Sequence, residues 1–276
     1  MSEKSTQFTE RWCDCFQEFY SHSDDHEEDI TKFLAQKKLE LGERKYDEFC
    51  DHDGFEQLLR QEFPFKWRES QFHRDKNTES DRAWDIVQDV FDRVARHGDK
   101  KLILSEHMDR EDYKALNTLP ASIANLKDLR ELVIYRSQIS FLPREIMHCE
   151  NLQVFTPYTS WRLHWLPYEI TNCPLKSTTI STRALYGNYK LRPPFPNVKD
   201  KAWLWRDGKE YCSVCFKECD DLDQYWISQV IGTDIVPLLA SVCGFVCLSA
   251  LGDPANGYVP YPHQGGPFVS QPESNY

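Results

Sequence analysis

The stretch LNTLPASIANLKDLRELVIYRSQI, residues 116–139, decides the fold, because its pattern returns twice further along the chain. The second copy is ISFLPREIMHCENLQVFTPYTSWRL, and the third is HWLPYEITNCPLKSTTISTRAL. Each copy carries a Leu-Pro pair followed by isoleucine three residues after the proline, and the pairs recur after 23 and then 24 residues, at 119–120, 142–143 and 166–167. Self-similarity at such a period is typical of repeat architectures.

A strand-like L-x-x-L-x-L pattern follows each Leu-Pro pair. Its apolar positions are Leu129, Leu132 and Ile134, then Leu152, Phe155 and Pro157, then Leu175, Thr178 and Ile180. The combination resembles the leucine-rich repeat family, in its short LP-x-x-I form. This resemblance implies an α/β fold, a short solenoid with a concave sheet. Residues 80–266 together resemble a group of uncharacterised leucine-rich repeat proteins, which brings no established activity.

The repeats depart from that family in ways that bear on the rest of the chain. The inward asparagine that follows each strand in the family is replaced here by Ser137, Ser160 and Arg183. Three stacked repeats need covered ends. We therefore expect helical residues 78–115 to cover the N-terminal end and a C-terminal module to cover the other.

The remaining segments follow from composition. Residues 1–77 read as an acidic helical region, the repeats span 116–190, and a Pro-rich connection follows. This Pro-rich connection spans 191–210, a cysteine module spans 211–252, and an irregular tail spans 253–276.

The cysteine module contains C-x2-C, then 27 residues, then C-x3-C. The first pair places two thiolates on a tight turn and the second presents two more from a helical turn, so the four can complete a closed tetrahedral zinc site. The proposed ligands are Cys212, Cys215, Cys243 and Cys247. The arrangement resembles treble-clef modules, notably the group called TRASH, although the long spacing implies an inserted hairpin.

Two other interpretations of these cysteines stay open. Cysteine often packs as a small apolar residue in a metal-free core. The uncharged run 235–252, between Asp234 and Asp253, also approaches the length of a membrane span, which makes a membrane-anchored adaptor an alternative. Pro237 and the lack of flanking basic residues count against it.

Charge and the N-terminus restrict the functional classes. The net charge is −11, which disfavours nucleic-acid binding because phosphate contacts need clustered basic residues. No secretory signal opens the chain, so we expect a cytoplasmic protein with reduced thiols. The segment 121–200 is the exception in charge, with 10 Lys and Arg against 6 Asp and Glu, or +4.

No nucleotide-binding, hydrolase or metalloprotease motif occurs in the sequence. The sheet of the repeats instead combines Tyr and Arg, the residue types that dominate interface hot spots. We predict a non-catalytic surface for a protein partner with an acidic segment, formed by Arg130, Tyr135, Arg136, Tyr158, Arg162, Arg183 and Tyr186. An enzyme that uses the cysteine cluster, through thiol or ubiquitin-ligase-like chemistry, is the other alternative.

Overall fold

The computed structural model describes residues 82–188, 195–199, 210–266 and 269, all within one compact unit of the chain. The predicted acidic region 1–77 and most of the Pro-rich connection 191–210 lie outside these residues. In the described part, short helices alternate with strands, and the strands form one parallel and one mixed sheet. The predicted α/β class is confirmed at this level.

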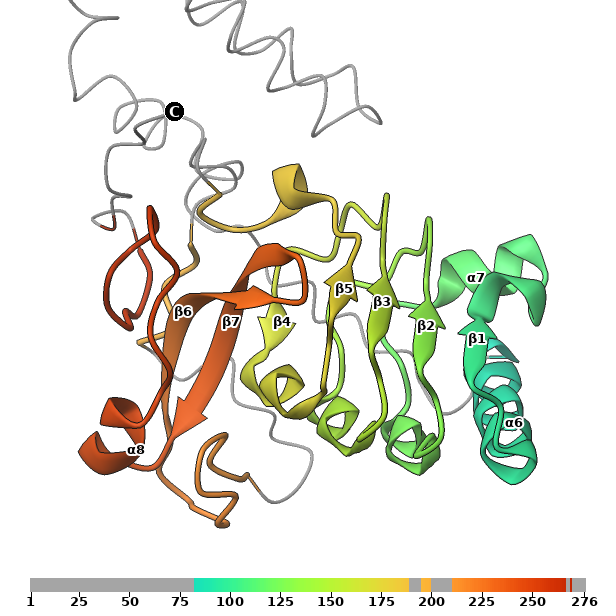
Figure 1. Cartoon of the computed structure of the whole chain (residues 1–276), viewed down its shortest axis with the longest axis horizontal. Coiled ribbons are helices and arrows are strands. Elements are labelled where there is room, and N and C mark those ends of the chain that lie inside the picture. Colours follow the sequence, from blue (N-terminus) through green and yellow to red (C-terminus); the bar gives the residue numbers. More distant parts are fainter. Residues whose placement is uncertain (1–81, 189–194, 200–209, 267–268, 270–276) are drawn as a thin grey trace, which may run out of the picture. The chain divides into compact units, whose positions relative to one another are not determined.

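The L-x-x-L-x-L segments form a parallel sheet. Its four strands lie side by side in Figure 1, in the order β1 (Lys101–Ile103), β2 (Glu131–Val133), β3 (Val154–Thr156) and β5 (Ser177–Thr178). The repeat length sets the register, because Glu131 pairs with Val154 and Val154 pairs with Ser177. Alternation along each strand buries Leu132 and Phe155 in the core and leaves their neighbours half-exposed.

Each Leu-Pro pair leads into a short 3-10 helix, because proline at the residue before the helix holds an extended conformation. These helices are η2 (Ala121–Asn125), η3 (Arg144–His148) and η4 (Tyr168–Asn172). Figure 1 shows the helical turns aligned along one edge of the sheet. The isoleucine of every LP-x-x-I motif is fully buried between them.

The start of the described region is more varied than the predicted helical cap. Helix α6 (Arg82–His97) buries three valines and Phe91 on one face, and it ends before Gly98, whose φ of +66° favours glycine. Strand β1 and η1 (Leu104–Glu106) follow, and then α7 (Arg110–Ala115), which Asp109 caps through its side chain. The sheet therefore begins one strand earlier than the sequence predicted, since the three residues of β1 are too few to show a period.

Serine side chains stabilise the bend after each strand. The Ser160 hydroxyl donates to the Ile134 carbonyl at 2.9 Å and accepts from the Ser137 amide at 3.2 Å. In the next repeat the Thr159 amide donates to Ser181 Oγ at 2.7 Å. The buried residue at the third bend is thus Ser181, whereas Arg183 is exposed.

The second sheet is built around a long hairpin. Strands β6 (Asp223–Ile231) and β7 (Asp234–Val242) pair antiparallel across a two-residue turn, and β4 (Leu166–Pro167) pairs parallel with the other side of β7. A central strand that is covered on both faces needs apolar residues throughout, which explains much of the uncharged run 235–252. That run forms most of β7 and the short helix α8 (Phe245–Ser249). In the described ranges, no helix is long and apolar enough to cross a membrane.

The hairpin turn contacts the edge of the parallel sheet. At β5, the Thr178 amide donates to Thr233 Oγ1 at 3.1 Å, and the Ile180 amide donates to Asp234 Oδ2 at 3.1 Å. Gly232 permits this approach, because its φ is +61° and a Cβ there would lie 3.0 Å from the Ser177 and Thr178 backbone. Edge donors that would otherwise be open to another strand are therefore bonded.

Candidate metal centre

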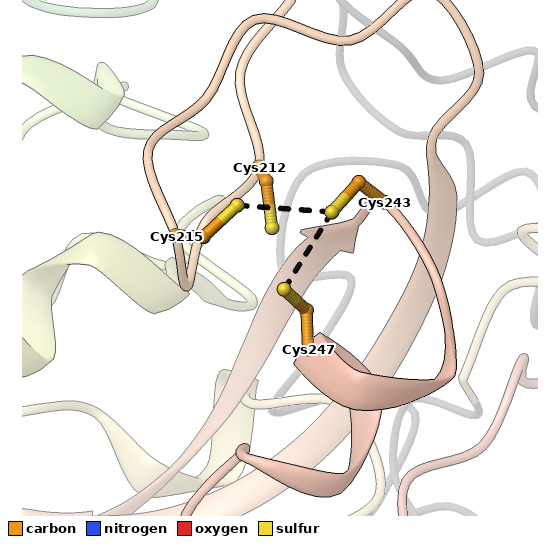
Figure 2. Close-up of side chains that lie close together, drawn as sticks. All are labelled: Cys212, Cys215, Cys243 and Cys247. Atoms are coloured by element: carbon orange, nitrogen blue, oxygen red, sulfur yellow. Dashed lines mark hydrogen bonds between the residues drawn. The ribbon is translucent and has the colours of Figure 1, made fainter.

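Two turns bring the four predicted ligands together, as Figure 2 shows. The first turn is closed by hydrogen bonds from the Cys212 amide to Lys217 O and from the Phe216 amide to Cys212 O, each at 3.0 Å. Cys243 follows β7 directly, and Cys247 lies on α8. The hairpin β6–β7 accounts for the long spacing, because its two strands carry the chain away from the first cysteine pair and back to the second.

The sulfur geometry matches a four-coordinate site. All four Sγ atoms lie within 4.8 Å of one another, and the distances from Cys243 Sγ are 3.7 Å to Cys215 Sγ and 3.5 Å to Cys247 Sγ. A tetrahedron with metal–sulfur bonds of about 2.3 Å has sulfur–sulfur edges of about 3.8 Å. The cluster could therefore hold a metal ion with small side-chain adjustments.

The thiols differ in how readily they lose a proton. Burial raises the pKa of Cys212, but the backbone N–H groups of Cys215, Val214 and Cys243 outweigh it and bring this pKa down to about 7. The thiol–thiol hydrogen bond with Cys243, and then burial, raise the pKa of Cys247 to about 12. A bound cation would reverse the second effect, since metal ligation requires deprotonated thiols.

The other described cysteines stand apart from the cluster. Cys219 lies on the same loop, yet its thiol donates to Asp221 O at 3.4 Å. Cys149 and Cys173 are buried one repeat apart, and their thiols donate to Ile123 O and Ile146 O. Burial raises the pKa of both to about 12, so they are unreactive core residues. The remaining three cysteines lie outside the described residues.

A buried ion pair joins the first cysteine turn to the repeats. Glu169 Oε1 lies 3.0 Å from the Arg144 guanidinium and accepts the Ser213 hydroxyl at 2.9 Å. Arg144 also donates to the carbonyl of Tyr211, which precedes the first ligand. Burial raises the pKa of Glu169, and the Arg144 charge opposes that shift. The turn that carries Cys212 is thereby fixed to η3 and η4.

Three of the predicted partner-binding residues, Tyr135, Arg136 and Tyr158, lie together just after β2 and β3. The rings of Tyr135 and Tyr158 stack with their centroids 6.1 Å apart, and the Arg136 guanidinium lies 5.0 Å above the Tyr135 ring. Tyr158 is 46% exposed. Arg130 is exposed where β2 begins. The two tyrosines and Arg136 make one continuous surface, which we call the tyrosine ladder.

The other three predicted residues lie elsewhere. Tyr186 is only 1% exposed, so the expectation that it lies on the surface is wrong. It packs against Trp226, whose indole is surrounded by Trp165 and Phe195 in a second core cluster. Arg162 is half-buried and donates to Asn117 at 3.3 Å, and Arg183 is exposed at η5 (Thr182–Ala184).

Several exposed aromatic and apolar residues escaped the sequence analysis. Trp161 is 48% exposed, three residues after Tyr158. Phe216, Phe245 and Val246 are exposed around the cysteine cluster. In the sequence GFVC, Phe245 and Val246 read as part of an apolar run. Only the structure distinguishes the buried Cys247 from these exposed neighbours.

No family model matches this chain, and no curated protein matches it either. The resemblance to leucine-rich repeat proteins therefore stays a prediction carried by the motif pattern.

Proposed function

We propose that residues 101–185 form a short leucine-rich repeat solenoid that binds a protein partner on its sheet face, without catalysis. The observation that carries this proposal is the tyrosine ladder. In it the half-exposed Tyr158 stacks on Tyr135, and the Arg136 guanidinium lies over the Tyr135 ring. Stacked aromatic rings offer a large contact area with little conformational freedom to lose on binding. Tyrosine and arginine are also the side chains enriched at interface hot spots.

The charges beside the ladder favour an acidic partner segment. Lys101 on β1 is paired with Glu131, so that edge of the face is close to neutral. Arg130 and Arg136, by contrast, have no carboxylate within ion-pair distance among the residues that the structure describes. Arg136 lies over the Tyr135 ring and fits a carboxylate-bearing peptide, because arginine binds carboxylates through paired N–H donors. Arg130 adds a positive charge at the other end of β2.

We further propose that the cysteine cluster binds Zn²⁺ in a structural role. Four thiolates with no remaining open position are typical of structural zinc sites, whereas catalytic sites keep a position for water. Bound zinc would hold the first cysteine turn against α8. Such a site needs reduced thiols, which agrees with a cytoplasmic setting.

In this proposal the zinc module covers the C-terminal end of the solenoid. The hydrogen bonds of Thr233 and Asp234 to the edge strand β5 support that role, as does the Arg144–Glu169 pair under the first cysteine turn. Three repeats present too little internal surface to be stable with open ends. The module and the repeats would then fold as one unit.

The binding proposal is tested with an array of peptides that vary in acidic and aromatic content. The full-length chain should select acidic peptides, and Tyr158→Ala or Arg136→Ala should weaken that binding by about tenfold or more. Arg96→Ala removes an exposed arginine from α6, away from the sheet, and should change nothing. Unchanged binding in both ladder variants would contradict the proposal, and so would a large fall in their unfolding temperature, because that would make the ladder part of the core.

A further inference from the structure

We propose that the cysteine module carries a second docking surface, which binds a basic partner segment that also bears apolar residues. The surface consists of Phe216, Phe245 and Val246, and we call it the apolar tip. Phe245 is 80% exposed, Val246 is 81% exposed and Phe216 is 42% exposed. This surface is separate from the tyrosine ladder in both position and charge.

The cysteine cluster brings together the two turns that carry these three residues. Phe216 follows Cys215, and the other two lie between Cys243 and Cys247, whose sulfur atoms lie within 4.8 Å of that of Cys215. Figure 2 shows the four cysteines of these two turns facing one another, and each turn carries exposed apolar residues next to its cysteines. On α8, Cys247 is buried whereas Phe245 and Val246 are exposed, so the short helix exposes its first two apolar side chains.

Exposure of these residues is not what folding alone would favour. Burial of apolar side chains stabilises the folded chain, and Phe245 and Val246 contribute little of that stabilisation where they lie. Contiguous apolar residues on a surface mark interaction sites more often than isolated ones do. A partner that covered the tip would recover this free energy.

The backbone at Phe216 provides an independent observation. Its φ is +58°, in the left-handed region that glycine adopts readily and that other residues adopt only with strain. Glycine would therefore suit this turn better, yet the chain carries phenylalanine and exposes it. Non-glycine residues held in such conformations cluster at functional sites.

The charge of the module identifies the chemistry of the partner. Residues 210–266 contain one basic side chain, Lys217, and seven acidic ones, which gives 1 − 7 = −6. Three of the acidic residues, Glu218, Asp220 and Asp221, follow Phe216 within five positions. Such a field attracts a cationic segment, repels an anionic lipid surface and disfavours a second copy of the same surface. A basic peptide with interspersed apolar residues fits both properties of the tip.

The test uses the zinc-loaded full-length chain and two labelled 18-residue peptides, one of leucine and lysine at helical spacing and one with glutamate in place of lysine. Fluorescence anisotropy should show binding of the lysine peptide, weakened by salt, and little binding of the glutamate peptide. The double variant Phe245→Ser, Val246→Ser should raise the dissociation constant at least tenfold. Val230→Ser, at a 63% exposed site on β6, is the matched control and should have no effect.

Two further measurements separate the possible outcomes. Tyr158→Ala should leave lysine-peptide binding intact, so that failure of the tyrosine ladder and failure of the apolar tip are distinguishable. The metal content of the double variant must equal that of the unaltered chain. Equal affinity of the lysine peptide for the double variant would overturn the proposal, as would equal binding of the glutamate peptide. Vesicle binding or dimerisation that the double variant abolishes, with no lysine-peptide binding, would assign the tip to a membrane or a second copy and would equally overturn it.

Discussion

The parallel sheet and the cysteine module differ in how they are held together. The sheet places fully buried leucine, isoleucine and phenylalanine side chains in one continuous core, and each repeat adds a few of them. The module adds a cluster of four thiols to the apolar core of its hairpin, and it exposes large apolar residues next to that cluster. Stability that is spread over many contacts leaves few apolar side chains for the surface. A metal ion bound at the thiols, as proposed, would instead leave the neighbouring apolar side chains available for binding.

The junction between the two regions combines both arrangements. Apolar residues of β7 pack into the same core as the repeats, and Glu169 reaches from η4 to the first cysteine turn. Loss of metal should therefore loosen the module first and reach the repeats through β7 and Glu169. The predictions below test this order.

Metal removal should have the largest effect. Structural zinc contributes about 10 kcal/mol of apparent binding free energy in small domains. Chelation, or Cys247→Ser, should therefore remove one metal ion per chain and increase hydrogen exchange in β6 and β7 far more than in β2 and β3. Elemental analysis and exchange mass spectrometry measure the two quantities.

Cys219→Ser is the matched control for that experiment. This thiol lies on the same loop but bonds to the Asp221 carbonyl, so metal content and exchange should stay unchanged. A variant at Cys219 that loses the metal as fully as Cys247→Ser would show that the ligand set is wrong. Equal exchange in both sheets after chelation would show instead that the chain unfolds as a single unit.

A pair of phenylalanines sharpens the comparison at the level of single side chains. Phe155 on β3 is fully buried, so Phe155→Ala should reduce the free energy of unfolding by about 3–5 kcal/mol. Phe245→Ala removes the same atoms from an exposed position and should change it by about 0.5 kcal/mol or less. Chemical denaturation of both variants gives the difference. Similar losses would mean that α8 packs far more closely than its exposure indicates.

The repeats were the part of the fold most accessible from the sequence. Leu-Pro pairs and apolar isoleucines recur at a regular spacing, so the three copies predict the same positions for helices and strands. Strand β1 and the bend at Ser181 were missed because neither recurs at the expected position. The continuous apolar run of β7 also left a membrane alternative open, since a strand buried on both faces has no alternating pattern.

The candidate site was predictable to a similar degree. Spacing identified the four cysteines, because ligand pairs on two turns follow from local geometry. It could not show that Tyr186 is buried, since that burial depends on Trp226, forty residues further along the chain. Exposure of Phe245 depends likewise on which face of α8 meets β7. Contacts between residues so far apart along the chain produce no periodic pattern in the sequence.

A buried histidine supplies the smallest and last of the predicted effects. His263 pairs with Trp226 through the backbone, packs its ring 4.5 Å from that of Phe195 and accepts the Gly265 amide on Nδ1. Burial lowers the pKa of His263 from 6.5 to about 4. Between these values the unfolded chain binds a proton that the folded chain does not, so the free energy of unfolding falls as the pH decreases.

At pH 5 this single linkage should lower the free energy of unfolding by about 2 kcal/mol relative to pH 7.5, and the loss should level off below pH 4. Carboxyl groups also titrate in this range, so the measurement is a difference between variants. Denaturation of His263→Gln from pH 7.5 to 4 should lack that part of the slope, whereas a glutamine at exposed His148 should retain it. Parallel curves for His263→Gln and the unaltered chain would show that water reaches the His263 ring, and that the aromatic cluster around Trp226 on β6 is not closed to solvent.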